Sequence, residues 1–181
     1  MSQRFEAEQC IAAPLPRVFA FFADPRNLPR IMPPGQAALV QLNLVAPRFP
    51  ADRVPADGER MAGVGTEIVF KFRAILHLPM HERWTALITE FALNEYFIDS
   101  QKQGPFRRWQ HTHSFGAKTI NGRDGTLIRD VVEYEVGFGI IGRMLESLLF
   151  QRMLRTTFEY RKQALERIFS SQPAHATLTE S

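Results

Sequence analysis

The sequence has one cysteine and no long apolar run, and these two features limit the classes of protein to which it can belong. Cys10 alone excludes an internal disulfide and fits a reducing compartment. The longest apolar stretch, residues 136–149, is interrupted by Gly, Arg and Glu and is too short to cross a bilayer. The first ten residues carry acids and lack the apolar segment of a signal peptide. We therefore expect a cytoplasmic protein without stable membrane insertion.

Lysine is scarce beside arginine, and the net charge is only +3. The basic residues are spread along the chain and form no run interleaved with aromatics, so we expect no nucleic-acid partner. Neither a lysine-bearing phosphate loop nor a Ser–His–Asp arrangement stands out, and we expect no cofactor. The 181 residues, 45% of them hydrophobic, suit one domain over residues 1–170, followed by a polar, disordered tail over 171–181. The oligomeric state has no signature in the sequence.

Hydrophobic periodicity predicts an α+β chain. Apolar residues alternate in seven segments and recur at helical spacing in two others. Asp24-Pro25 is a helix-start pair and predicts a further short helix. Residues 46–64 are rich in Pro, Gly, Ala and charge, and are typical of a long connection. The predicted strands are about 4–11, 37–45, 66–76, 81–93, 96–103, 107–118 and 126–136, and the longer helices are about 15–22 and 140–169.

The most informative stretch is FIDSQKQGPFRRWQHTHSF, residues 97–115. Alternation around a Gly104-Pro105 turn places Phe97, Asp99 and Gln101 on one strand face. Trp109, His111, His113 and Phe115 share the matching face of the next strand, and the apolar members indicate that this face looks inward. Counting outward from the turn pairs Asp99 with His111 and Gln101 with Trp109. A two-residue turn at Asn121-Gly122 pairs His113 with Asp130 and Phe115 with Ile128.

This inward cluster of ionisable groups has four interpretations. It is an internal network in which carboxylates accept from imidazole N–H groups, since buried charges are normally paired. Alternatively, it is the polar spot of a cavity that orients an apolar ligand. A His–Asp pair can also serve acid–base catalysis. Finally, His residues two apart on a strand can bind a metal with Asp130 as a third ligand, although no distinctive ligand spacing supports this. Glu82, on the preceding strand, is a possible further member.

Several segments resemble the START-like (SRPBCC) superfamily and its bacterial polyketide-cyclase-like members. They are PLPRVFAFFADPRNLPRIMPP, the 97–115 stretch, GTLIRDVVEYEV and GFGIIGRMLESLLFQRMLRTTFEYRKQAL, in that order over about residues 5–169. The resemblance implies a helix-grip fold, in which a curved antiparallel sheet of about seven strands wraps a long C-terminal helix, with two short helices after the first strand. It also implies a cavity between sheet and helix, around Leu145 to Leu149. The candidate lining residues are Trp84, Phe97, Asp99, Trp109, His111, His113, Asp130, Val132, Tyr134, Leu145 and Leu149.

Three functions follow from this resemblance as expectations. The preferred one is non-covalent binding or carriage of a small hydrophobic or aromatic molecule. The second is a cyclase- or dehydratase-like enzyme acting on a polyketide-like substrate, with His111 or His113 as base and Asp130 orienting it. The third is a protein- or membrane-interaction module that uses the 46–64 connection, which is longer than usual for the superfamily.

Overall fold

The computed structural model describes the backbone of residues 2–50, 54–73, 81–136 and 140–170, and the side chains of these residues except 72–73, 81–82, 136 and 140–148. The predicted tail at 171–181 and the side chains of Glu82 and Leu145 lie outside this description. The strands are β1 (Gln3–Ile11), β2 (Ala37–Asn43), β3 (Glu67–Arg73), β4 (His81–Ala92), β5 (Tyr96–Gln103), β6 (Phe106–Ile120) and β7 (Arg123–Val136). The helices are α1 (Leu15–Ala23), α2 (Ile140–Ser170) and the 3-10 turns η1 (Pro25–Arg30) and η3 (Gly58–Arg60).

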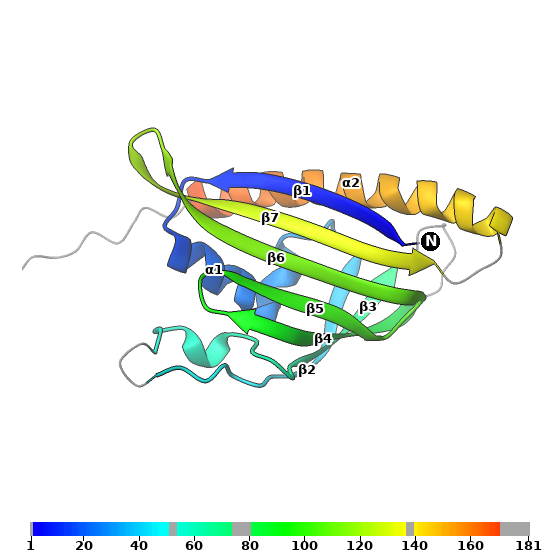
Figure 1. Cartoon of the computed structure of the whole chain (residues 1–181), viewed down its shortest axis with the longest axis horizontal. Helices are drawn as coiled ribbons and strands as arrows, with labels where there is room; N and C mark the ends of the chain where they lie inside the picture. The colour runs from blue at the N-terminus through cyan, green and yellow to red at the C-terminus, as the bar shows by residue number, and fades with distance from the viewer. Residues whose placement is uncertain (1, 51–53, 74–80, 137–139, 171–181) are drawn as a thin grey trace, which may run out of the picture.

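The strands form one antiparallel sheet in the order β1-β7-β6-β5-β4-β3-β2. The sheet curves, and α2 runs along β1 and β7 with α1 at one end (Figure 1). We call the face toward α2 the inner face. The predicted helix-grip α+β fold is confirmed, and α2 is a continuous helix of 31 residues. None of the described helices is long and apolar enough to cross a membrane.

Local turn chemistry fixes which residues of β6 and β7 face each other. Asn121 and Gly122 have φ of +50° and +74°, the left-handed pair that a type I′ hairpin turn requires. The ladder that starts there pairs His113 with Asp130, as the sequence predicts. Across the other edge of β6, Asp99 of β5 pairs with His111, also as predicted.

The predicted pairing of Gln101 with Trp109 lies one step beyond the β5–β6 ladder, whose last pair is Ser100 with Gln110. The Gln101 side chain reaches across the turn instead. Its amide nitrogen donates to the carbonyl of Phe106 (2.7 Å), and its Oε1 accepts from the Phe106 N–H (3.2 Å). Gln101 therefore stabilises the hairpin that carries the cluster.

Two apolar clusters fill the inner face, and the polar residues lie between them. Along β6, Trp109 belongs to a cluster with Tyr134, Phe150 and Leu154, whereas Phe115 belongs to a larger cluster around Phe19. His111 and His113 occupy the two inward positions between Trp109 and Phe115. The apolar packing on both sides holds the imidazoles in a largely desolvated environment.

The connection over residues 46–64 is part of the core at its C-terminal end, which its composition did not reveal. Met61 and Ala62 are buried, and the Ala62 N–H donates to the carbonyl of Ala23 at the end of α1 (2.7 Å). Gly63 donates to the carbonyl of Val45 (2.8 Å), and a Cβ at this position would lie 2.7 Å from the backbone nitrogen of Pro47. Only glycine fits this close approach to Pro47. The Ala62 hydrogen bond anchors the end of the connection to α1.

Candidate functional site

A cavity of about 170 Å³ lies between the inner face, α1 with η1, and α2. Its walls are mainly apolar, with contributions from Phe22, Ile31, Ala86, Ile88 and Val132. The described residues of α2 that line it lie between Phe150 and Arg161, beyond the predicted 145–149 segment. Asp99, His111, His113 and Arg161 give the wall its ionisable groups, and Asn27, Gln36 and Thr157 add neutral polar ones.

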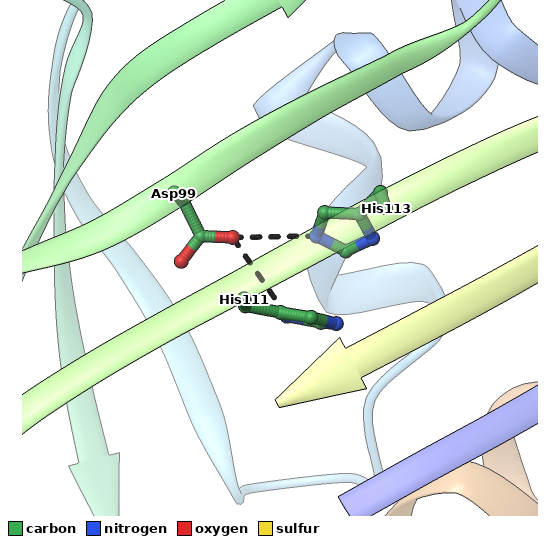
Figure 2. A group of neighbouring side chains, drawn as sticks. All are labelled: Asp99, His111 and His113. Carbon is green, nitrogen blue, oxygen red and sulfur yellow. Dashed lines mark hydrogen bonds and ion pairs between the residues drawn. The ribbon is translucent and has the colours of Figure 1, made fainter. Parts of the chain in front are cut away.

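Asp99 on β5 faces both imidazoles of β6 (Figure 2). Its Oδ2 lies 3.3 Å from Nε2 of His113 and 3.7 Å from Nδ1 of His111. Strand β4 has a bulge at Thr89, next to Ile88, the residue that pairs with Asp99. The Thr89 hydroxyl donates to the carbonyl of Ile98 (3.3 Å). The strand that carries Asp99 is therefore tied to its neighbour immediately beside the site.

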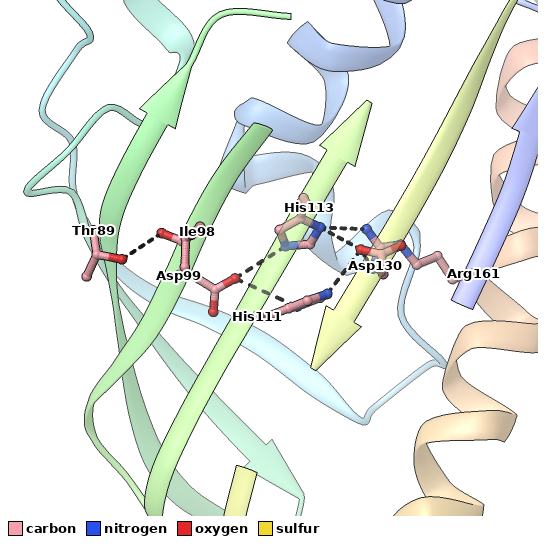
Figure 3. Close-up of polar contacts among 7 residues, drawn as sticks. All are labelled: Thr89, Ile98, Asp99, His111, His113, Asp130 and Arg161. Carbon is pink, nitrogen blue, oxygen red and sulfur yellow. Dashed lines mark hydrogen bonds and ion pairs between the residues drawn. The ribbon is translucent and has the colours of Figure 1, made fainter. Parts of the chain in front are cut away.

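Asp130 on β7 approaches the same two rings from the opposite side (Figure 3). Its Oδ1 lies 2.7 Å from Nδ1 of His113 and 3.0 Å from Nε2 of His111. Arg161 of α2 adds Nη1 at 3.4 Å from the same oxygen. Each imidazole thus has one nitrogen directed at Asp130 and the other at Asp99. We call these five residues the His–Asp cluster.

Neighbouring rings hold the side chains of the cluster in place. Phe97 stacks on His113 with centroids 4.4 Å apart, and the rings of His111 and His113 are 3.8 Å apart. The guanidinium of Arg161 lies over Phe22 at 4.7 Å and over Phe158 at 5.2 Å, both within cation–π range. The cluster is therefore fixed by packing as well as by polar contacts.

Burial and charge act against each other on the two carboxyl groups. Burial by itself raises the pKa of Asp130, but the Arg161 guanidinium and the two imidazoles hold that pKa well below its ordinary range. Burial also raises the pKa of Asp99, but a hydrogen bond from His113 and the nearby His111 bring it below the ordinary value. Both groups are carboxylates at neutral pH.

The two imidazoles shift in opposite directions. Burial lowers the pKa of His111, and the adjacent charge of His113 lowers it further. Burial also acts to lower the pKa of His113, but hydrogen bonds to Asp130 and Asp99 outweigh it and raise that pKa. His113 is therefore the more readily protonated member of the pair.

Two buried donors beside the cavity remain without a hydrogen-bond partner among the described residues: the indole N–H of Trp109 and Nε of Arg161. The Trp109 side chain favours the charged form of Asp99, although its N–H does not meet hydrogen-bond geometry. Buried donors are usually satisfied. Both residues belong to the cavity wall.

The structure places seven of the predicted site residues on the cavity wall: Trp84, Phe97, Asp99, Trp109, His111, His113 and Val132. Among described residues, Asp130, Tyr134 and Leu149 are not part of that wall. Asp130 lies behind the imidazoles, and Tyr134 packs against Phe106 and Phe150. Sequence reasoning missed Arg161, although it falls on the apolar stripe of α2 with Leu154, Phe158 and Leu165.

Residues 11–159 match the model of the polyketide cyclase/dehydrase and lipid transport family, and the chain belongs to that family. No curated protein matches it. Solved structures with the same fold include an aromatase/cyclase from a Streptomyces species, with 12% identity, a TM-score of 0.67 and coverage of 98% of this chain and 99% of that one. A START superfamily protein from Mycobacterium smegmatis is 16% identical, with a TM-score of 0.59 and coverage of 93% and 97%. Norcoclaurine synthase from Thalictrum flavum, solved with a transition-state analogue, is 16% identical, with a TM-score of 0.58 and coverage of 94% and 96%.

Proposed function

We propose that this chain, as one domain over residues 1–170, binds a small and mainly apolar molecule in its internal cavity. The polar end of that molecule would lie against Asp99, His111 and His113. The cavity of about 170 Å³ with its apolar wall is the observation that carries the proposal. An apolar cavity of about 150 Å³ is large enough to hold benzene. We infer a ligand of one or two rings, since drug-sized pockets are about 300–1,000 Å³.

The charge balance of the cluster favours a neutral ligand. The two carboxylates face the Arg161 guanidinium and His113, the more readily protonated of the two imidazoles. A ligand carboxylate would add an uncompensated negative charge beside Asp99 in a desolvated site. A hydroxyl or carbonyl would add none, and its oxygen would accept a hydrogen bond from the indole N–H of Trp109.

Displacement of an apolar fluorescent dye tests the binding function. Ala86 is buried in the cavity wall, so Ala86→Phe should fill the space and abolish dye binding while the circular dichroism spectrum stays native. Ala117→Phe is the matched control, because Ala117 is exposed near the end of β6. A folded Ala86→Phe protein that binds dye as tightly as wild type would refute the proposal. Native mass spectrometry of freshly purified protein, followed by extraction, would identify a co-purified molecule.

Acid–base conversion of the bound molecule is the second candidate, as in a cyclase or dehydratase. The opposite pKa shifts of His111 and His113 favour it, because paired groups with separated pKa values can serve as base and acid. We expect His111→Ala to abolish conversion of an extracted ligand while the protein still binds the dye. Recovery of the ligand unchanged after incubation with wild-type protein would contradict conversion, and carriage would remain as the proposed function.

A further inference from the structure

We propose that Asp99, His111 and His113 form a binding site for one divalent transition-metal ion at the wall of the cavity. This inference goes beyond the proposed function, because the cavity binds an apolar molecule with or without an ion. Each of the three residues offers one ligand atom, and these atoms all lie within 4.8 Å of one another (Figure 2). Two imidazoles and one carboxylate suit ions such as Zn²⁺ or Fe²⁺.

The contacts on the Asp99 side are longer than usual for charge-assisted hydrogen bonds and are close to the separation of two ligands of one ion. Oδ2 of Asp99 lies 3.3 Å from His113 Nε2 and 3.7 Å from His111 Nδ1. A charge-assisted N–H···O bond is shorter, about 2.7–2.9 Å. Ligands bound at about 2.0–2.1 Å to a tetrahedral ion are separated by about 3.3 Å. The Asp99–His113 distance already has that spacing, and the His111 ring would have to move closer to Asp99 to reach it.

The Asp130 side supplies the outer shell that a metal-binding histidine needs. A carboxylate only accepts, so the contacts of 2.7 and 3.0 Å require an N–H on His113 Nδ1 and on His111 Nε2. An ion that binds displaces the proton on His113 Nε2 to water, and the lone pairs on His113 Nε2 and His111 Nδ1 then face Asp99. Metal-ligating histidines usually donate their other N–H to a carboxylate in this way. Arg161 at 3.4 Å holds that carboxylate in turn.

The charges around the ion and the number of protein ligands both favour a fourth ligand from outside the protein. In the metal-bound state both imidazoles are neutral, because binding releases the second proton of His113 to water. The carboxylates of Asp99 and Asp130 and the guanidinium of Arg161 then leave one net negative charge. A divalent ion reverses this to one positive charge, and a hydroxide or another anionic oxygen restores neutrality. Three protein ligands with a free fourth position are typical of catalytic zinc rather than structural zinc. Asp99, His111 and His113 all line the cavity, so the fourth ligand would come from there.

Titration of the chelator-treated full chain with Co²⁺ and Zn²⁺ tests the site. We expect one ion per chain, visible as Co²⁺ d–d absorption and measurable by calorimetry with Zn²⁺. Asp99→Asn and His111→Gln should each weaken binding by about 100-fold or more, and Asp130→Asn by about 10–100-fold through the outer shell. Asp124→Asn is the matched control, because this carboxyl is exposed at the far end of β7, and it should change nothing.

Ion affinity that stays within about threefold of wild type in folded Asp99→Asn and His111→Gln proteins would overturn the proposal. So would the absence of stoichiometric binding to wild type. A readout that requires no variant is the X-ray absorption spectrum of Co²⁺-loaded wild-type protein. Scattering from two imidazoles in a shell of nitrogen and oxygen ligands supports the site, and a shell without imidazole refutes it. Dye binding by the metal-free protein tests the cavity independently, so a failure of metal binding can be distinguished from a failure of the proposed binding function.

Discussion

Asp99 and Asp130 are the same chemical group placed on opposite sides of the same two imidazoles, but their environments differ. Asp130 Oδ1 has three nitrogen contacts between 2.7 and 3.4 Å, one of them from Arg161. Asp99 has longer contacts, and its side chain is 17% exposed against 7% for Asp130. Asp99 lines the cavity, whereas Asp130 lies between the imidazoles and α2.

The difference separates a structural role from a binding role within one network. A carboxylate with three close nitrogen partners fixes the positions and tautomers of the rings and has little capacity left to bind a ligand. A carboxylate with loose contacts and an open side can exchange one partner for another. Stability should therefore depend mainly on Asp130, and ligand or ion binding mainly on Asp99.

The largest expected effect is that of Asp130→Ala. This change leaves the buried Arg161 without its carboxylate and takes the 2.7 Å partner from His113, and removing one partner of a buried pair costs about 3–5 kcal/mol of the free energy of unfolding. Urea denaturation monitored by circular dichroism measures it. Asp124→Ala, on an exposed part of the same strand, should leave the midpoint unchanged. An unchanged midpoint for Asp130→Ala would show that the cluster contributes nothing to stability.

Asp99→Ala should cost less, about 1–2 kcal/mol, because each imidazole keeps its contact with Asp130 and only weak partners are lost. The same denaturation assay gives the value. A cost equal to or above that of Asp130→Ala would break the distinction between the two carboxylates.

Acid titration should sharpen the same comparison. Both carboxyl pKa values are lower in the folded chain than the unfolded value of about 3.9, so their stabilisation is present above that pH and is lost as pH falls below it. The pKa of Asp130 is lowered more, so Asp130→Ala should flatten the acid limb of the stability curve more than Asp99→Ala. Equal slopes in the two variants would mean that Arg161 does not distinguish the two groups.

The smallest effect is expected for Arg129→Ala, next to Asp130 but on the opposite face of β7. Arg129 donates to Glu6 at 2.8 Å, yet the two side chains are 48% and 40% exposed. Exposed ion pairs contribute little because water and salt screen them. The denaturation midpoint should stay close to that of wild type. A marked loss would show that charge on the outer face matters as much as charge inside.

The register of the site was predictable because short-range rules determine it. Strand alternation gave the inner face of β6, and the Asn121-Gly122 turn placed His113 opposite Asp130. The position of Arg161 depends on how α2 rotates against the sheet, which no local rule supplies. Its place on the apolar stripe was nevertheless a usable signal, since a lone cation among core positions needs a buried partner.

The atomic arrangement and the cavity were beyond sequence reasoning. Which imidazole nitrogen faces which carboxylate depends on ring rotamers that Phe97 and Phe22 select through tertiary packing. The cavity runs along α2 from Phe150 to Arg161, and its extent depends on how these side chains pack against the sheet. The burial of Met61 and Ala62 follows from one backbone contact with α1 and has no periodic signature.

The pairing of β1 with β7 has a consequence for how quickly the protein folds. Strands β5, β6 and β7 follow one another through short turns, so the segments that carry Asp99, the two histidines and Asp130 can associate through local contacts. Strand β1 lies at the N-terminal end of the chain and pairs with β7, so this pairing closes a long loop. Helix α2 follows β7 in the sequence. Closing such long loops slows folding. Until β1 and α2 dock, the growing hairpins expose an apolar strand edge, so the rate of that closure determines how long the nascent chain is prone to aggregate.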